Sequence, residues 1–319
     1  MKVLIIRFSS IGDIVLTSPV IRCIRQQIKD AEVHFLTKKN FREVIAHNPY
    51  IDKIHCMSDN VRECLPGLRK EIFDQVIDLH HNFRSAHVKR ALKAESHSFN
   101  KLNIEKWLLV NLRINRLPSV HIVDRYFETV KGLGVKNDGL GLDYFISEEE
   151  KVDVATRCGS VPGGYHVLVA GGSYYTKQIP LHKLAEVCTL SDKKILVLGG
   201  REDAAQGEEL ERQFGSKVFS CCGKFSINQS ASIIQQADKV ISSDTGLMHI
   251  AAAYKKDIVS VWGNTIPEFG MSPYKAGDNS RILEVKGLSC RPCSKLGYKK
   301  CPKGHFKCMN EIEMKGIFD

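Results

Sequence analysis

Two successive series of short apolar segments, separated by intervals long enough for helices, constrain the fold of this chain more than any other feature. Strands are predicted at 2–7, 32–36 and 75–79 in the first series and at 165–170, 194–198, 239–243 and 257–262 in the second. Strands that alternate with helices form βαβ units and parallel sheets. The chain is therefore predicted to be an α/β protein with two consecutive doubly wound units and a cleft between them.

The break between the two series predicts a domain boundary. The acidic run Glu148–Glu150 and the glycine-rich stretch 159–164 bracket this break. A length of 319 residues, at about 150 residues per domain, also favours two domains. We therefore expect an N-terminal domain at 1–155 and a C-terminal domain at 156–319. Within the first, a helix is predicted over 14–28, and Pro19 is expected to kink or restart it.

The charge balance favours an anionic partner. The chain has 46 Lys and Arg against 36 Asp and Glu, a formal net charge of +10. Nucleotides, nucleic acids, phosphorylated glycolipids and membrane surfaces all fit such an excess. No apolar run approaches the roughly 20 residues of a membrane-spanning helix, and the N-terminal run Val3–Ile6 is too short for a signal peptide. The predicted location is therefore the cytoplasm.

A turn of small residues that ends in a carboxylate follows the first predicted strand. Gly12 permits a tight strand-to-helix turn, and Asp13 falls where the next helix begins. Because Asp is a preferred N-cap residue, one interpretation is that Asp13 caps this helix. The other is that Asp13 is a general base directed into the cleft, where it deprotonates an incoming hydroxyl.

The loop after the strand at 239–243 carries an anion-binding pattern. Asp244, Thr245 and Gly246 open an Ala-rich helix, whose first-turn amides and dipole suit a diphosphate. Thr245 and Gly246 leave room for close approach, and Asp244 could accept hydrogen bonds from sugar hydroxyls. The alternative is that Asp244 only caps the helix and that His249 is an interior histidine.

Two more strand ends carry charged side chains. Lys177 follows a glycine turn after the strand at 165–170, and its ammonium group either faces a phosphate or is solvated. Glu202 follows the strand at 194–198 and either binds ribose hydroxyls or begins a helix. The chain lacks the glycine-rich dinucleotide-binding fingerprint, the P-loop and the nucleophile elbow of α/β-hydrolases. These absences argue against a dehydrogenase, a P-loop NTPase and an α/β-hydrolase.

Taken together, these segments resemble glycosyltransferase family 9, the heptosyltransferases that build the inner core of lipopolysaccharide. The resemblance rests on Ser9-Ser10-Ile11-Gly12-Asp13, Thr176-Lys177-x-x-Pro180 and Asp244-Thr245-Gly246-Leu247-Met248-His249-x-Ala251-Ala252. Further agreement comes from Asp78-x-x-x-Asn82-x-Arg84-Ser85, His121-x-x-Asp124-Arg125-Tyr126 and Cys290-x-x-Cys293. One departure is Ile179, which stands where the family commonly has Trp.

The resemblance implies a GT-B fold, in which two Rossmann-like domains face each other across a cleft. The N-terminal domain would bind the acceptor and the C-terminal domain the nucleotide sugar. The implied reaction is inverting and metal-independent, with an ADP-sugar as co-substrate and no other cofactor. Asp13 would be the catalytic base, and Lys177 would neutralise the departing diphosphate. The residues implied at the donor are Ser10, Gly12, Ser173, Glu202 (ribose), Phe225 (base), Asp244 (sugar), Thr245, Gly246, Leu247 and His249.

Two basic or cysteine-rich stretches have alternative interpretations. From His80 to Arg125, nine Lys and Arg face three acidic residues, which suits either a solvated surface or an anionic glycolipid. Within that stretch Trp107–Val110 either contacts a membrane or, as the favoured alternative, belongs to the core. Cys290, Cys293, Cys301 and Cys308 would suit structural zinc, but buried or redox-labile thiols are favoured.

The leading functional hypothesis is transfer of a heptose, or a related sugar, from an ADP-sugar to a lipopolysaccharide core acceptor. One alternative keeps the fold and uses a UDP- or GDP-linked sugar. Another is a non-catalytic protein that binds nucleotides or glycolipids. Nucleic acid is not an expected partner, because no recognisable RNA- or DNA-binding motif accompanies the basic residues. Peripheral contact with an anionic inner-membrane leaflet is an additional expectation for the cytoplasmic protein.

Overall fold

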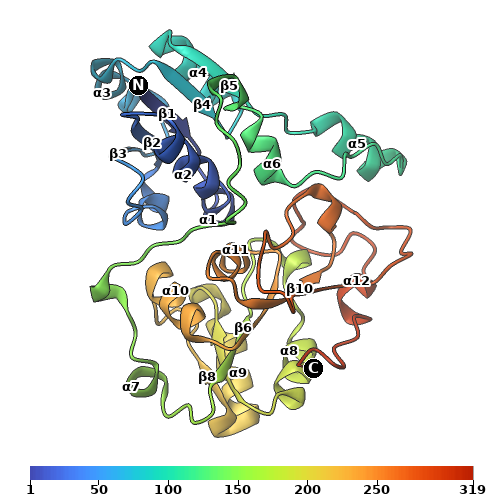
Figure 1. Ribbon diagram of the computed structural model, residues 1–319. Helices are drawn as coiled ribbons and strands as arrows, with labels where there is room; N and C mark the ends of the chain where they lie inside the picture. The colour runs from blue at the N-terminus through green and yellow to red at the C-terminus, as the bar shows by residue number, and fades with distance from the viewer. Residues whose placement is uncertain (319) are drawn as a thin grey trace. The chain divides into compact units, whose positions relative to one another are not determined.

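A computed structural model describes residues 1–318, and the chain divides into two compact units. The first unit comprises Met1–Lys101 and Val120–Phe145, and the second comprises Leu102–Ser119 and the residues from Ile146 onward. Each unit is built around one parallel sheet with helices packed on it (Figure 1).

The first unit contains a five-stranded sheet in the order β3-β2-β1-β4-β5, with every neighbouring pair parallel. Its strands are β1 (Lys2–Ile6), β2 (Glu32–Lys38), β3 (Lys53–Met57), β4 (Gln75–Asp78) and β5 (Glu95–Ser98). Its α-helices are α1 (Ile11–Val15), α2 (Ser18–Gln27), α3 (Leu65–Glu71), α4 (Phe83–Leu92) and α6 (Ile122–Phe127). The prediction of a parallel sheet from β1, β2 and β4 is confirmed for this unit.

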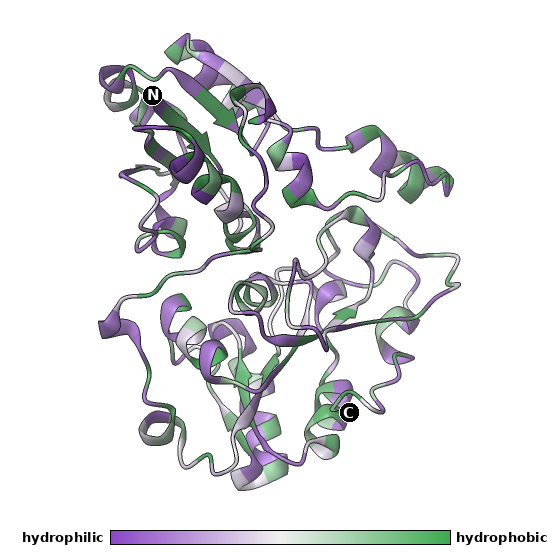
Figure 2. Ribbon diagram, in the orientation of Figure 1, coloured by the Kyte–Doolittle hydropathy of each residue, from purple (hydrophilic) through white to green (hydrophobic). Residues whose placement is uncertain are grey.

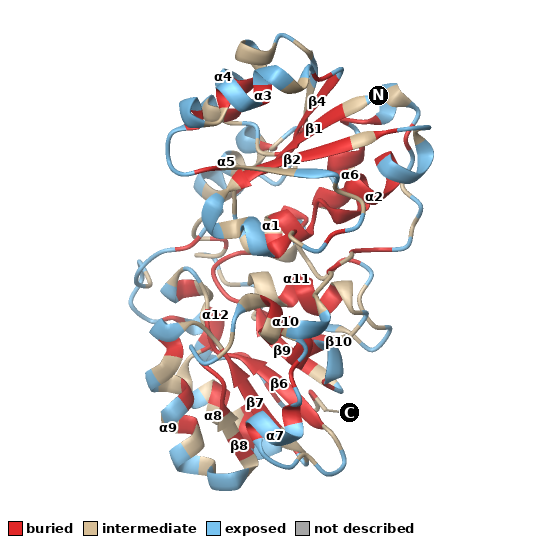
Figure 3. Cartoon of the chain, turned by 90° about the vertical axis from the view of Figure 1, so that its left-hand side faces the viewer, coloured by how far each residue is buried: buried red, intermediate tan, exposed pale blue. Residues whose placement is uncertain are grey.

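The core of the first unit follows the central strands. Residues 3–6 of β1 are completely buried, and Figure 3 shows β1, β2 and β4 largely in red. Both faces of β1 are covered, which explains the uninterrupted apolar sequence at residues 3–6. The predicted helix over 14–28 is in fact α1 followed by α2, which restarts with Pro19 in its first turn, as expected for a residue without a backbone N–H.

The second unit contains a six-stranded parallel sheet in the order β11-β10-β9-β6-β7-β8. Its strands are β6 (Tyr165–Val169), β7 (Lys194–Leu198), β8 (Val218–Ser220), β9 (Lys239–Ser243), β10 (Asp257–Trp262) and β11 (Arg281–Glu284). Its α-helices are α5 (Asn103–Leu112), α7 (Val154–Cys158), α8 (Leu181–Leu190), α9 (Ala204–Phe214), α10 (Ile227–Gln236), α11 (Gly246–Ala253) and α12 (Lys307–Asn310). Figure 2 shows that the strands of this sheet are mostly hydrophobic.

Residues 102–119 pack with the second unit, although they lie between two segments of the first unit in the sequence. They contact the segment that follows β11: Arg113 Nη1 donates a hydrogen bond to the carbonyl oxygen of Pro292 at 2.7 Å, and Lys295 Nζ donates one to Asn103 Oδ1 at 3.4 Å. Residues 146–155 also belong to this unit. The division at residue 155 assigned both segments to the N-terminal domain, and no short-range sequence signal distinguishes these long-range contacts.

The strand order identifies where each sheet can bind a ligand. In the first sheet the order reverses between β1 and β4, and in the second it reverses between β6 and β9. Open parallel sheets bind ligands beyond the carboxyl ends of the strands at such a reversal. The loops after β1, β4, β6 and β9 are therefore the best placed for function. None of the helices formed by residues 1–318 has the length and hydrophobicity required to cross a bilayer.

Candidate active site

The loop after β1 places Asp13 in the first turn of α1. Ser10 is the N-cap residue, and its backbone N–H and its hydroxyl donate hydrogen bonds to Asp13 Oδ2 at 3.2 and 2.8 Å. Asp13 is the third residue of the helix, so the interpretation of Asp13 itself as the N-cap is wrong. Gly12 is buried at the turn between them. Three predicted site residues, Ser10, Gly12 and Asp13, therefore lie within one helical turn.

An arginine that sequence reasoning missed holds the Asp13 carboxylate. Arg7 Nη2 lies 2.5 Å from Asp13 Oδ1, and Arg7 Nε donates a hydrogen bond to the carbonyl oxygen of Ser9 at 2.9 Å. A further hydrogen bond joins Arg7 Nη1 to the carbonyl oxygen of Leu79, at the end of β4. Burial alone would raise the pKa of Asp13, but Arg7 and the hydrogen bonds from Ser10 lower it to about 2. Asp13 is therefore ionised at neutral pH.

The loop after β4 is organised by a buried carboxylate. Asp78 is completely buried and accepts hydrogen bonds from the Ser85 hydroxyl at 2.7 Å and from the backbone N–H of His81 at 2.6 Å. Lys89 Nζ lies 3.1 Å from the same carboxylate. Asp78 therefore has a structural role here, and the ammonium group of Lys89 is paired with Asp78.

The start of α4 adds basic and aromatic groups at this edge. Asn82 caps the helix by accepting a hydrogen bond from the backbone N–H of Ser85 at 3.0 Å. The Arg84 guanidinium lies 5.8 Å from the centroid of the Phe8 ring, and His80 packs against the same ring with 4.8 Å between centroids. Burial and the positive charge of Arg7 lower the pKa of His80 to about 3, so this imidazole is neutral at physiological pH.

In the second unit, the loops after β6 and β9 bring Lys177 and Asp244 together. Lys177 Nζ donates a hydrogen bond to Asp244 Oδ2 at 2.5 Å, and Thr265 Oγ1 donates one to the same oxygen at 3.3 Å. Lys177 ends the 3₁₀ helix η5 (Tyr175–Lys177), and Thr265 follows β10. The loops after β6, β9 and β10 thus converge on one ion pair. The sequence predicted Lys177 and Asp244 separately and did not predict that they form a pair.

The N-terminus of α11 lies beside this ion pair. Thr245 is the N-cap residue, and its side chain makes no capping hydrogen bond; its hydroxyl lies 3.1 Å from Ser242 Oγ. Gly246 and Leu247, in the first turn, are partly exposed. First-turn amides and the helix dipole favour an anion at such an end. Because Thr245 is the N-cap, the alternative that Asp244 caps the helix is wrong.

His249 lies on the buried face of α11, with 1% of its surface exposed. This burial agrees with the alternative that His249 is an interior histidine. The loop after β6 contains Ser173, which is exposed. The contacts of the described residues therefore bring Lys177, Asp244 and the start of α11 together, while His249 packs behind them.

The loops after β7 and β8 carry Glu202 and Phe225. Glu202 is exposed, and the adjacent Asp203 provides the helix-start carboxylate, since its Oδ2 accepts a hydrogen bond from the Gly200 N–H at 2.8 Å. Glu202 also lies in the first turn of the 3₁₀ helix η6 (Arg201–Asp203), which agrees with the alternative that it begins a helix. Phe225 is half-buried, and the Arg157 guanidinium lies 5.0 Å from its ring centroid. The strands β7 and β8 are neighbours, so both residues lie at one part of the sheet edge.

Arg291 supports the loop that carries Thr265, and sequence reasoning did not identify it. Its guanidinium donates hydrogen bonds to the carbonyl oxygens of Gly263 at 2.5 Å and Thr265 at 2.9 Å, and it pairs with Glu284 at 2.8 Å. The side chain of Arg291 is 6% exposed. The only signal for Arg291 in the sequence is its position between Cys290 and Cys293, and this position does not indicate its hydrogen-bond partners.

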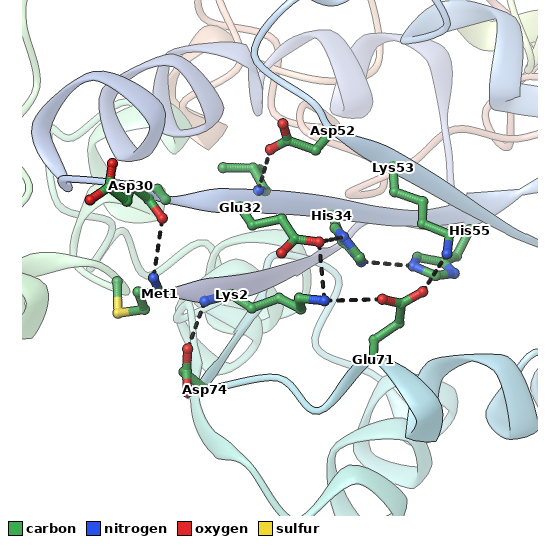
Figure 4. A network of polar contacts seen from close by, with 12 residues as sticks. Met1, Lys2, Asp30, Glu32, His34, Asp52, Lys53, His55, Glu71 and Asp74 are labelled. Atoms are coloured by element: carbon green, nitrogen blue, oxygen red, sulfur yellow. Dashed lines mark hydrogen bonds and ion pairs between the residues drawn. The ribbon is translucent and has the colours of Figure 1, made fainter.

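A second polar cluster lies away from these loops, in the first unit (Figure 4). His34 Nδ1 lies 3.0 Å from His55 Nε2, and His34 Nε2 lies 2.8 Å from Glu32 Oε1. Ligand atoms of His34, His55 and Glu71 lie within 4.8 Å of one another, which is a spacing that could hold a metal ion. Burial lowers the pKa of His55 to about 4, so this imidazole is neutral at physiological pH.

The Glu71 carboxylate of this cluster is already paired with two ammonium groups. Lys53 Nζ pairs with Oε1, and Lys2 Nζ lies 3.2 Å from Oε2; these bonds lower the pKa of Glu71 to about 2. A metal ion would have to displace both lysines from the carboxylate. The arrangement is therefore better explained as a charge-compensated network that joins β1, β3 and α3.

The four C-terminal cysteines are free thiols in the structure. Burial raises the pKa of Cys293 to about 11 and that of Cys308 to about 12, so both are protonated at neutral pH. Cys290 Sγ lies 3.9 Å from His305 Nε2. Within residues 1–318, these cysteines do not form a group of three ligand atoms within 4.8 Å of one another.

The family model described as glycosyltransferase family 9 (heptosyltransferase) matches residues 61–302, well over half of the chain. The chain is 25% identical over 353 residues to lipopolysaccharide heptosyltransferase 1 of Campylobacter coli, covering 99% of this chain and 97% of that protein. It is 24% identical over 330 residues to lipooligosaccharide heptosyltransferase 2 of Campylobacter jejuni, covering 100% and 97% of the two chains.

Solved structures show the same fold. The structure of ADP-heptose lps heptosyltransferase II from E. coli matches with a TM-score of 0.73 and 18% identity, covering 98% of both chains. A glycosyl transferase family 9 structure from Veillonella parvula matches with a TM-score of 0.74 and 22% identity, covering 89% of this chain and 86% of that one. The predicted GT-B fold, with two parallel α/β sheets, is therefore confirmed.

Proposed function

The chain belongs to glycosyltransferase family 9, and from that premise we propose that it transfers a heptose from ADP-heptose to the inner core of lipopolysaccharide. The reaction would invert the anomeric carbon and would use no metal ion. Relatives named as heptosyltransferases of lipopolysaccharide and lipooligosaccharide match the chain over nearly its full length and support this choice of donor and acceptor. The acceptor would bind to the first unit and the donor to the second.

The observation that carries the proposal is the Lys177–Asp244 pair at the start of α11. Negative charge grows on the diphosphate as the glycosidic bond to it breaks, so fixed cationic and amide donors stabilise the transition state more than the ground state. Lys177 and the first-turn amides of Gly246 and Leu247 are donors of this kind. They would provide the charge stabilisation that a divalent metal ion provides in other transferases.

Asp244 would fix both the lysine and the donor sugar. It accepts hydrogen bonds from Lys177 and Thr265, which orient its carboxylate. Carboxylate oxygens retain lone pairs for sugar hydroxyls after such contacts. Glu202 would accept hydrogen bonds from the ribose, Phe225 would pack against the base, and the remaining predicted donor contacts would be Ser10, Gly12, Ser173 and Thr245.

Asp13 would deprotonate the acceptor hydroxyl as it attacks the anomeric carbon. Its carboxylate is ionised at neutral pH and is oriented by Arg7 and Ser10. A base with a pKa of about 2 is weak, but the attacking hydroxyl becomes strongly acidic as its bond to carbon forms. Arg7 would thus favour the ionised form of Asp13 at the expense of its strength as a base.

A thermal-shift screen of nucleotide sugars, followed by a transfer assay, tests the proposal. ADP-heptose should raise the melting temperature of the protein, since a ligand that binds only the folded state stabilises it. Transfer to a lipopolysaccharide acceptor lacking heptose should follow without added metal and persist in EDTA. If a UDP- or GDP-sugar stabilises the protein and ADP-heptose does not, the donor is wrong and the family assignment stands.

A further inference from the structure

A groove in the second unit runs beside α5. Its other wall is the segment from Ser294 to Tyr298, and its volume is about 580 Å³. Apolar side chains from α5, including Ile104, Trp107 and Val110, line it together with Tyr298. The hydrogen bonds from Arg113 to Pro292 and from Lys295 to Asn103 join α5 to the opposite segment. Both walls therefore belong to one packed structure.

The side chains at this groove are unusually exposed for their type. Of the lining residues, Ile104 is 72% exposed, Trp107 56% and Tyr298 42%. Leu296, in the segment that forms the other wall, is 54% exposed. Leu109, on the other side of α5, is 8% exposed and anchors the helix. The expectation that Trp107–Val110 is a core segment is therefore wrong for Trp107. A cluster of exposed apolar groups on one surface indicates an interaction site, whereas single exposed apolar residues do not.

The segment that forms one wall of the groove belongs to a basic stretch of the chain, and two lysines, Lys106 and Lys295, line the groove itself. Residues 285–310 contain seven Lys and Arg and no Asp or Glu. The exposed ones are Lys286, Lys295, Lys299, Lys300, Lys303 and Lys307. On α5 itself, Glu105 is the only acidic residue. Lysines that flank exposed Trp, Ile and Leu side chains are typical of surfaces that bind anionic lipid bilayers.

We propose that α5 and the segment 294–303 form a docking site for an anionic phospholipid bilayer. Ile104, Trp107 and Leu296 enter the boundary between headgroups and acyl chains, and Lys299 and Lys300 contact lipid phosphates. A second copy of the chain fits this surface less well, because two basic segments would face each other. The inference goes beyond the proposed reaction, since bilayer binding needs neither a donor nor an acceptor sugar.

The chain offers a native fluorescent probe for the test. It has two tryptophans, Trp107 and Trp262, and Trp262 is 1% exposed within the core. Subtracting the emission of the Trp107→Phe variant from that of the wild type isolates the signal from α5. The full-length protein is mixed with vesicles of phosphatidylethanolamine and phosphatidylglycerol, or of phosphatidylcholine alone. Vesicles with brominated acyl chains report the depth of the indole ring.

The Trp107 emission should shift to the blue and be quenched by brominated lipid, with anionic vesicles only. In co-sedimentation, Ile104→Asn combined with Trp107→Asn should weaken partitioning at least tenfold. Lys299→Gln combined with Lys300→Gln should weaken it about tenfold, with a reduced dependence on salt. The matched controls are Leu190→Asn, an exposed apolar residue elsewhere in this unit, and Lys29→Gln combined with Lys315→Gln.

Circular dichroism establishes that each variant folds. Failure of the wild type to bind anionic vesicles, or equal binding by the groove variants and the controls, would overturn the proposal. Binding without any change in Trp107 emission would also overturn it, because the bilayer would then contact another surface. Since these vesicles lack lipopolysaccharide and no nucleotide is added, each of these outcomes leaves the proposed transfer reaction untouched.

Discussion

At the reversal of strand order in the first sheet an arginine holds a carboxylate, whereas in the second sheet a carboxylate holds an ammonium group. Both contacts, Arg7–Asp13 and Lys177–Asp244, are 2.5 Å long. They differ in which partner is more buried. In the first pair the arginine side chain is 8% exposed and the aspartate 20%, and in the second the aspartate is 10% exposed and the lysine 18%.

In each pair the more exposed group is the one proposed for chemistry, and the more buried group orients it. Removal of either partner leaves the other charge without its counter-ion, and the loss of stability is larger when the charge left behind is the more buried one. Removal of Asp13 or Lys177 should therefore reduce both turnover and stability, whereas removal of Arg7 or Asp244 leaves a charge that solvent reaches more readily. The experiments below measure turnover and stability separately for members of each pair.

The largest effect is expected for Asp13→Asn. Loss of the base should lower turnover by about 10²–10⁴-fold, because an amide cannot accept the proton of the acceptor hydroxyl. Nucleotide affinity, measured by calorimetry, should stay near that of the wild type. Asp59→Asn is the control, since the Asp59 side chain is 94% exposed in the same unit. Near-normal turnover by Asp13→Asn would eliminate this residue as the base.

The next largest effect is expected for Lys177→Met. Loss of the ammonium should lower turnover by about 10²–10³-fold, since fixed donors to a developing anion contribute that much. Asp244→Asn should lower turnover as well, but Lys177→Met should lower the melting temperature more, because it leaves the more buried charge of Asp244 unpaired. Lys217→Met is the control. If Asp244→Asn proves the less stable of the two, the burial of the remaining charge does not set the cost of breaking this pair.

A smaller effect, visible mainly against pH, is expected for Arg7→Gln. The pKa of Asp13 is about 2 with Arg7 present, and without Arg7 only the hydrogen bonds from Ser10 would oppose the effect of burial, so the pKa should rise. Asp13 must be ionised to act as a base, so the acidic limb of the rate profile should move to higher pH. Rates measured between pH 4 and 8 will show this shift. An unchanged acidic limb would mean that Arg7 does not control the charge of Asp13.

The same pair also affects stability. The folded-state pKa of Asp13 is depressed, so its ionised form stabilises the protein above the unfolded pKa of about 4, and this contribution is lost as pH falls toward 2. Arg7→Gln should abolish that contribution. Melting curves of the wild type and the variant at pH 7 and pH 4 will therefore differ most at pH 7.

The smallest effect on turnover is expected at the network around Glu71, which lies outside both strand-order reversals. The pKa of His55 is about 4 in the folded protein and about 6.5 in the unfolded chain, so the unfolded chain binds the extra proton between these values. Stability should fall as pH falls from 6.5 toward 4, and His55→Gln should weaken this dependence. His87→Gln, an exposed histidine on α4, is the control. If the stability of His55→Gln depends on pH as strongly as that of the wild type, the network is not the source of this dependence.

The central strands were predictable from the sequence, and the edge strands were not. β1, β6, β7, β9 and β10 have apolar residues on both faces because helices cover both sides of the sheet. The edge strands carry polar residues, for example Glu-Ser-His-Ser in β5 and Arg-Ile-Leu-Glu in β11, and their sequences do not differ from those of loops. Long-range pairing, rather than local preference, makes them strands.

The candidate site likewise contains residues that could be predicted from the sequence and residues that could not. Asp13, Lys177 and Asp244 were identified because they lie in loops after predicted parallel strands, where ligands bind, and because their motifs resemble those of the family. Arg7, Thr265 and Arg291 were not, since each acts through a partner that is distant in sequence or hidden within a strand end. Sequence also could not decide between Glu202 and Asp203 as the helix-start carboxylate, because the two are adjacent and only Asp203 points to the Gly200 amide.

The membership of α5 in the second unit restricts how this protein can be dissected. The chain passes from the first unit to the second at 101–102, returns at 119–120 and passes again at 145–146. A single cut in the gene, at any position, cannot yield two complete units. A fragment that ends at residue 145 would retain α5 but lack the segment that α5 packs against, so its apolar side would be uncovered. To produce the units separately, a short linker must replace residues 102–119 in the first unit, and these residues must be supplied to the second unit.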